Sequence, residues 1–139
     1  MNCFHVEDGA LKPARATLLS AGYDFVSPVD FIIPAHGVSE VIDGQVSIEL
    51  DSWCVLLVFV RSSWGFKHGI TLVNGTGVID ADFYPNTIKF KFRNDSDEDF
   101  KVKRGDRIAQ GIILNYHCAA GNDALSCVVR TGGIGSTGD

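Results

Sequence analysis

The segment Val46-Ser-Ile-Glu-Leu-Asp-Ser-Trp-Cys-Val-Leu-Leu-Val-Phe-Val60 contains two strand patterns in succession. Residues 46–50 alternate between apolar and polar side chains, as expected of a strand with one face in water. Residues 54–60 form a continuous apolar run whose length is that of a strand. The segment therefore predicts two β-strands joined by a short polar turn.

Further strand patterns and turn signals lie outside this segment. Residues 87–92 alternate cleanly, and residues 107–114 and 125–130 are two more β-like runs. One short helical turn is expected from Ser62 to Phe66. Many short strands separated by frequent turns predict an all-β sandwich or barrel. The turn signals lie at residues 43–44, 74–75, 104–105 and 121–122, and at the acidic stretch 95–99, expected to be a solvated hairpin tip.

The composition is that of one globular domain. The chain has 139 residues, of which 45% are hydrophobic and 21% charged, and no linker or repeat divides it. Its 12 basic and 17 acidic residues give a net charge of −5, which disfavours binding to nucleic acid polymers and anionic membranes. The 15 glycines would weaken so small a domain unless particular backbone positions required them.

Several site classes and locations are disfavoured by the sequence. The longest apolar run, residues 53–60, is far shorter than the ~20 residues that span a bilayer. The N-terminus lacks the basic start and apolar core of a signal peptide. The four cysteines form no CxxC pair and the four histidines are scattered, which disfavours a zinc site. We therefore expect a cytoplasmic protein.

The glycines gather in segments that also carry charged and hydroxyl side chains. Arg61 and Ser62 offer a planar fork and a hydroxyl for phosphate oxygens. Asp80 can fix or deprotonate an attacking water, as general-base carboxylates do. Alternation predicts an apolar face with Ile79, Ala81 and Phe83, and a wet face with Asp80 and Asp82. The segments are residues 20–25, 61–69, 74–84, 102–111 and the tail 130–139, which is either a frayed end or an arm that orders over phosphates.

The order of the segments resembles a known family. Ala-Gly-Tyr-Asp, Arg-Ser-Ser, Gly-Val-Ile-Asp-Ala-Asp, Gly-Asp-Arg-Ile-Ala-Gln and Gly-Gly-Ile-Gly-Ser-Thr-Gly match, in order, the five motifs of the trimeric dUTPases, above all those of Gram-positive bacteria and their phages. The resemblance implies one jelly-roll domain over residues 1–139, with a β core to residue 129 and a mobile C-terminal arm from 130 to 139. It also implies a homotrimer whose active sites lie at the subunit interfaces.

The resemblance assigns an activity and the residues that perform it. The activity is hydrolysis of dUTP to dUMP and pyrophosphate, which keeps uracil out of DNA and supplies dUMP for dTMP synthesis. Asp80 matches the residue that orients and deprotonates the attacking water. The other catalytic matches are Asp24, Gln110 and Ser62. The phosphate-binding matches are Arg61, Ser62, Ser63, Gln110, Arg130, Gly135, Ser136 and Thr137.

Base and metal binding are implied in the same way. Phe83 replaces a tyrosine that packs on the deoxyribose, and Ile134 replaces a phenylalanine that stacks on uracil. The implied cofactor is Mg²⁺, held by triphosphate oxygens and waters, with no direct protein ligand and Asp24 acting through water. The uracil and deoxyribose matches, centred on the hairpin 74–80, are Asn74, Gly77, Val78, Ile79, Asp80, Phe83 and Ile134.

Two other functions are compatible with parts of the sequence. The related dCTP deaminases share the Arg-Ser-Ser motif, but they need a glutamate about ten positions beyond Asp80, where this chain has Phe90. Some phage members of the family act as nucleotide-gated regulators that bind other proteins. The water-activating carboxylate is not needed by a pure binder, so its presence favours the enzyme.

Overall fold

The computed structural model describes residues 1–120, 132–135 and 138, and these residues form an almost entirely β structure. Its main sheet has four antiparallel strands in the order β2-β12-β6-β8. The apolar run becomes its central strand β6 with the expected bounds. The strands are β2 (Tyr23–Val26), β12 (Arg107–Asn115), β6 (Cys54–Val60) and β8 (Gly77–Ile79).

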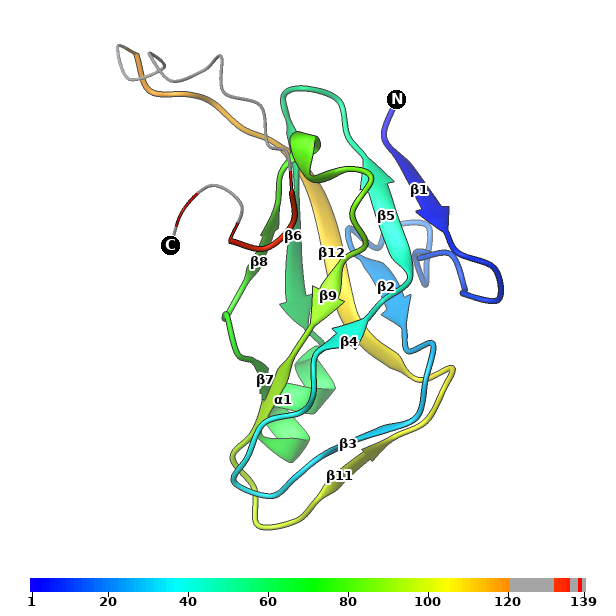
Figure 1. Cartoon of the computed structure of the whole chain (residues 1–139), viewed down its shortest axis with the longest axis vertical. Coiled ribbons are helices and arrows are strands. Elements are labelled where there is room, and N and C mark those ends of the chain that lie inside the picture. The colour runs from blue at the N-terminus through cyan, green and yellow to red at the C-terminus, as the bar shows by residue number, and fades with distance from the viewer. Residues whose placement is uncertain (121–131, 136–137, 139) are drawn as a thin grey trace.

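The remaining strands form antiparallel pairs around this sheet (Figure 1). Strands that are neighbours in the chain pair with different partners, so the chain passes back and forth between the sheets. The all-β prediction is therefore confirmed. The pairs are β1 (Cys3–Val6) with β5 (Val46–Glu49), β4 (Ile42–Asp43) with β9 (Lys89–Phe90), β3 (Phe31–Ile33) with β11 (Phe100–Val102), and β7 (Ile70–Leu72) with β10 (Phe92–Asn94).

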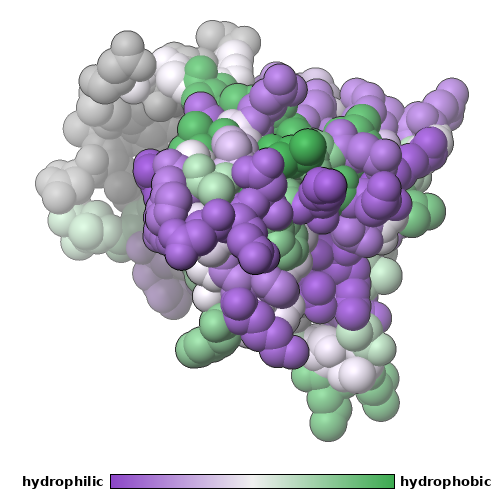
Figure 2. All heavy atoms as spheres, turned by 90° about the horizontal axis from the view of Figure 1, so that it is seen from below, coloured by the Kyte–Doolittle hydropathy of each residue, from purple (hydrophilic) through white to green (hydrophobic). Residues whose placement is uncertain are grey.

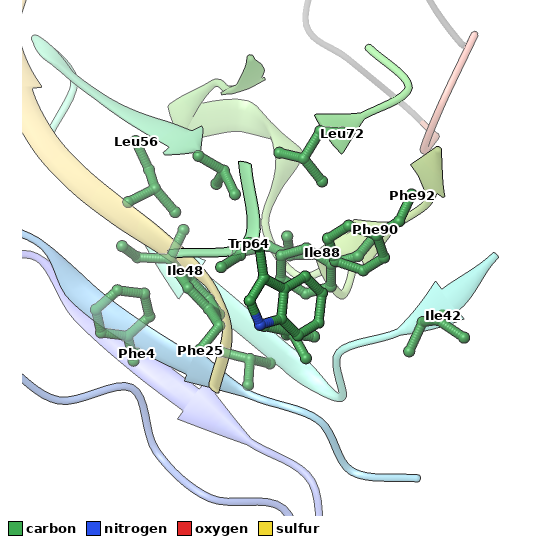
Figure 3. Packing of buried hydrophobic residues seen from close by; sticks show 14 of the residues in the cluster. Phe4, Phe25, Ile42, Ile48, Leu56, Trp64, Leu72, Ile88, Phe90 and Phe92 are labelled. Carbon is green, nitrogen blue, oxygen red and sulfur yellow. The ribbon is translucent and has the colours of Figure 1, made fainter. Parts of the chain in front are cut away.

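The hydrophobic core lies on the inner face of the main sheet (Figure 3). Leu56 from β6 and Phe25 from β2 are buried there. Helix α1 (Ser62–His68) follows β6 directly and extends the expected helical turn. Its Trp64 packs edge-on against Phe92 and Phe100, with ring centroids 5.2 and 5.0 Å apart. This packing anchors the helix, and with it the Arg61-Ser62 segment, to the core.

Two expectations about strands need correction. The alternating run 87–92 is interrupted at Lys91, because β9 pairs with β4 whereas β10 pairs with β7. The acidic stretch 95–99 joins β10 to β11, which pair with different strands, so it is a loop between two strand pairs and not a hairpin tip. The expected run 125–130 lies outside the described residues.

The end of the molecule that carries α1, β3 and β11 is mostly hydrophilic, with hydrophobic side chains in small separate groups (Figure 2). In the part of the chain that the structure describes, no helix combines the length and hydropathy needed to cross a membrane.

Candidate active site

One end of the main sheet gathers the residues expected to bind phosphates. Gln110 on β12 lies opposite Asp24 on β2 and Phe59 on β6, so the three side chains share one face of the sheet. Arg61 follows β6 with extended backbone, φ −69° and ψ 140°, which keeps its side chain on that same face. Ser62 begins α1 beside it, and Ser63 follows. The residues of the β core that are predicted to bind phosphates therefore lie close together.

Asp24 and Gln110 are held by close neighbours. The side chain of Asp24 is 20% exposed, and the Arg107 guanidinium Nη1 donates a hydrogen bond to its Oδ2 at 3.1 Å. Gly22 lies so close to Gln110 that a Cβ added to it would be 2.9 Å from Gln110 Oε1. The first-motif glycine thus leaves the space that the glutamine side chain occupies.

Replacing Gly22 by alanine is expected to lower kcat about tenfold, because the new methyl group displaces the Gln110 amide from its place. The fold should be retained, since the contact is with the end of a flexible side chain. Gly37→Ala is the matched control, because its added Cβ would be equally close, 2.9 Å, to Pro34 Cγ outside the site. Activity and melting temperature of both variants are measured. An unchanged kcat in Gly22→Ala contradicts the prediction.

Asp80 lies at the opposite end of the sheet. Strand β8 ends at Ile79, and a 3₁₀ turn at Ala81–Phe83 follows Asp80. The predicted alternation beyond Ile79 is therefore wrong, because the chain leaves the strand there. Asp80 is half-buried, and it lines an open cavity of about 530 Å³ together with Leu50, Ser52, Ala81, Asp82 and Tyr116.

The two ends are too far apart to act on one substrate within a single chain. Ile79 pairs with Leu56 in the ladder between β8 and β6, so Asp80 lies level with Val55. Arg61 is six residues further along β6, a separation of about 20 Å at the usual rise per residue. One chain thus provides two candidate half-sites. The phosphate half-site contains Asp24, Gln110, Arg61 and Ser62, and the other half-site contains Asp80.

A second cavity, of about 230 Å³, lies along β8. Among the described strands, β8 is at the edge of its sheet, and no described strand pairs with the backbone groups on its outer side. Phe83 is 8% exposed and contributes its ring to the cavity wall. The described lining residues are Val58, Leu72, Asn74, Gly77, Val78, Ile79, Phe83, Ile88, Lys89, Phe90 and Ile134, which include each uracil and deoxyribose match except Asp80.

The segment 74–80 differs from the expected hairpin. It contains strand β8 and most of the turn at residues 73–76, and the strands on either side of this turn, β7 and β8, pair with β10 and β6, so the turn joins two sheets. Tyr84 does not line the cavity, and its ring packs on His5 with centroids 5.3 Å apart. Tyr84, the neighbour of Phe83, is therefore not part of the cavity wall.

Lys89 is the one charged residue among the described lining residues of this cavity. Its Nζ lies 2.5 Å from Asp43 Oδ2 and also donates to the Thr87 hydroxyl. Partial burial raises the pKa of Asp43, but hydrogen bonds from Lys89, the Gln45 backbone and Thr87 outweigh it and hold that pKa below its usual value. The ion pair fixes the lysine stem as part of the wall.

The C-terminal arm is described only in part. Ile134 lines the cavity of its own chain and is 80% exposed. Gly135 has φ +77°, a conformation that favours glycine. The predicted arm residues Arg130, Ser136 and Thr137 lie outside the described residues. That the arm is donated by a different subunit stays a prediction.

The outer face of the main sheet carries a row of apolar side chains between the two half-sites. Ladder partners Leu57 and Ile112 share this face with Val55, Phe59 and Val78. Val78 is 61% exposed, and the other four are half-buried. An apolar sheet face of this kind is typical of a surface that another subunit covers.

Comparison with known proteins identifies the family. The dUTPase family model matches residues 9–138, nearly the whole chain. The chain belongs to the dUTPase family. The deoxyuridine 5'-triphosphate nucleotidohydrolase of Lactococcus lactis is 34% identical over 91% of this chain and 87% of its own length. That of Arabidopsis thaliana is 40% identical over 96% of this chain and 80% of its own length.

Solved structures of the family have the same fold. The dUTPase of Streptococcus mutans superposes with a TM-score of 0.76 at 28% identity, over 85% of this chain and 98% of that protein. A dUTPase from Staphylococcus aureus phage phi11, whose structure concerns a structural Mg(II) ion, gives a TM-score of 0.76 at 19% identity, over 86% of this chain and 93% of that one. The expected jelly-roll dUTPase fold is thereby confirmed.

Some residues beside the candidate site are not among those expected from the sequence. Arg107 lies within the fourth dUTPase motif, Gly-Asp-Arg-Ile-Ala-Gln, but was given no role although its charge and place in the motif pointed to one. Leu72, Ile88 and Phe90 form cavity walls, yet in the sequence they look like ordinary core residues. Lys89 was missed for a similar reason, because an alternating strand gives no indication of a nearby cavity.

Proposed function

We propose that this chain is a dUTP diphosphatase in which Asp80 activates the water that attacks the α-phosphorus. The supporting observation is a cavity of about 230 Å³ along the edge strand that ends directly before Asp80. A uracil in this cavity would meet the backbone groups of the edge strand, and the sugar would meet Phe83 in the cavity wall. The carboxylate then lies beside the first phosphate of a bound nucleotide.

The chemistry follows from positioning and charge. Asp80 holds the water by its carboxylate and takes a proton as the new oxygen–phosphorus bond forms. Arg61 and Ser62 donate to phosphate oxygens, and Ser62 stabilises the charge that develops on the bridging oxygen as pyrophosphate leaves. Gln110 contributes an amide donor from the same face. Water adds to phosphorus and the bond to the bridging oxygen breaks, which yields dUMP and pyrophosphate.

The residues present fit an Mg²⁺ ion bound through the substrate. Within residues 1–120, 132–135 and 138, no group of three or more His, Cys, Asp or Glu side chains is arranged to hold a metal. Triphosphate oxygens and waters would supply most ligands, with Asp24 contacting a water. When bound, Mg²⁺ neutralises part of the triphosphate charge, which matters for a chain whose own net charge is −5.

A homotrimer would bring the two half-sites together. In this arrangement Asp80 and the cavity of one subunit face Asp24, Gln110, Arg61 and Ser62 of another, and the arm of residues 130–139 closes the site from a different subunit. The separation of about 20 Å within one chain supports this, since no single chain completes the site. The apolar outer face between the half-sites supports it as well. We place this trimer in the cytoplasm, where its nucleotide substrate is made.

The arm should close weakly over the base, because Ile134 cannot stack on uracil. Replacing Ile134 by phenylalanine is expected to tighten binding of a non-hydrolysable dUTP analogue about tenfold, the lower part of the range for a base–aromatic stack. Calorimetry measures the affinity, and Ile134→Leu serves as the control for size without a ring. Equal affinities for the phenylalanine and leucine variants contradict the prediction.

The diphosphatase, the deaminase and the regulator can be distinguished by the products that they release. Phe90, at the position where a deaminase needs glutamate, is 2% exposed in the core, so no carboxylate is available there. A regulator of the family would bind dUTP without turnover. Pyrophosphate and proton release from dUTP with Mg²⁺ identify the diphosphatase, and ammonia release from dCTP identifies the deaminase. Tight dUTP binding without product identifies the regulator.

A further inference from the structure

Arg107 and Asp24 form a partly buried ion pair beside the phosphate half-site. The Asp24 side chain is 20% exposed, and that of Arg107 is 51% exposed. A carboxylate that is largely removed from water needs a charged or hydrogen-bonding partner, because desolvation of an unpaired charge is costly. Arg107 provides this partner from the solvent side, through its Nη1 to Asp24 Oδ2 at 3.1 Å.

An irregularity in the sheet brings Arg107 toward Asp24. Gln110 pairs with Asp24 and Ala109 with Phe25, but Arg107 pairs with Val26, so the register shifts between Arg107 and Ala109. In a regular ladder Arg107 would lie opposite residue 27, one position further from Asp24. β-Bulges re-aim side chains in this way and are frequent next to active sites.

The turn before Arg107 is tied to the end of β2. The Gly105 N–H donates to the Ser27 carbonyl at 2.9 Å, and the Ser27 N–H donates to the Asp106 carbonyl at 2.8 Å. The Lys103 N–H donates to Asp106 Oδ2 at 3.0 Å within the turn. These bonds fix the start of β12 against the strand that carries Asp24.

We propose that Arg107 is a positioning residue that holds the Asp24 carboxylate in its working orientation. One oxygen of Asp24 is fixed by the guanidinium, and the other is left to order the water around the triphosphate. The inference rests on the proposed dUTP hydrolysis and deepens it. Arg107 acts through Asp24, and it is not counted among the groups that touch the reacting atoms.

The test combines single and double variants of the full chain. Arg107→Met is expected to lower kcat about 10- to 100-fold while KM changes less than about threefold, because misplacing Asp24 weakens positioning in the transition state. Arg107→Lys should recover part of the loss, since it keeps the charge but not the planar fork. In an Asp24→Asn background, Arg107→Met should lower kcat further by less than about threefold.

A matched control and two readouts separate positioning from folding. Arg93→Met changes an exposed arginine between two buried residues of β10, outside the proposed site, and should leave kcat unchanged. Melting temperatures and calorimetric binding of a non-hydrolysable dUTP analogue are measured for every variant, and both should stay close to wild type in Arg107→Lys. A wild-type kcat in Arg107→Met, or losses that multiply in the double variant, overturns the proposal. A wild-type protein that leaves dUTP intact overturns the proposed function instead.

Discussion

Asp80→Asn is expected to lower kcat for dUTP about 1000-fold, within the range that general-base catalysis contributes. Asparagine has the shape of aspartate, but its amide cannot take the proton of the attacking water. The nucleoside cavity is unaffected, because its walls come from β8 and from side chains other than Asp80. Proton release with dUTP and Mg²⁺ measures turnover, and calorimetry with a non-hydrolysable analogue should show binding within about threefold of wild type.

Asp82→Asn is the matched control for this substitution. Asp82 is an exposed carboxylate two residues further along, and it lines the same open cavity. We expect less than a tenfold loss there, because Asp82 is exposed and lies within the 3₁₀ turn, whereas half-buried Asp80 directly follows the edge strand β8. If Asp80→Asn keeps more than a tenth of wild-type turnover, Asp80 is not the base.

Leu57→Asp is expected to dissociate the proposed trimer and to remove activity with it. Leu57 lies in the middle of the apolar outer face, opposite Ile112 and Val78. A carboxylate buried without a partner at a subunit contact costs several kcal/mol, enough to break the assembly. The two half-sites of each chain then lie about 20 Å apart and cannot complete each other. Light scattering measures the mass, and the dUTP assay measures turnover.

Ile32→Asp is the control for a new charge at an exposed position of a strand. Ile32 lies on β3 opposite Lys101, away from the outer face, and is 51% exposed. We expect it to leave both mass and turnover unchanged. A Leu57→Asp variant that is monomeric and fully active contradicts shared active sites.

Mixing inactive subunits tests the shared site directly. Asp80→Asn damages one half-site and Gln110→Ala damages the other, so each variant alone is expected to keep no more than about a tenth of wild-type turnover. After dissociation and random reassembly of equal amounts, about a quarter of the interfaces combine two intact halves, as expected of a closed symmetric ring. Turnover should therefore return to about a quarter of wild type. No recovery at all contradicts a site formed by two subunits.

Local sequence patterns correctly predicted the strands that keep the same pairing partners along their length. Residues 54–60 become β6 with the expected bounds, because this central strand packs on the core with one face and keeps apolar, half-buried side chains on the other. The helical turn after Arg61 is also correct, and Trp64 lengthens it by packing into the core. The short strands β3, β4 and β7 carry two or three residues each, too few to show a period.

Local sequence patterns gave wrong predictions where the chain changes from one pairing strand to another. The run 87–92 keeps its alternation, with Phe90 and Phe92 buried, but it is divided because its two halves pair with different strands. The alternation from Ile79 to Phe83 looks like a continuing strand, yet β8 ends at Ile79 and a 3₁₀ turn carries Phe83 into the cavity wall. Pairing partners depend on contacts far along the chain, which a local period does not contain.

The amino-acid sequence alone was enough to identify the β class, the ordered motifs and the chemical groups expected to bind a nucleotide, because these depend on residue type and spacing. Tertiary structure was needed to show that Asp80 and Arg61 lie at opposite ends of one sheet face, since strand register sets that separation. It was also needed to place Arg107 on Asp24, because a shift in the β2–β12 ladder re-aims that side chain. Register and bulges arise from packing between distant segments, and so they appear only in the folded chain.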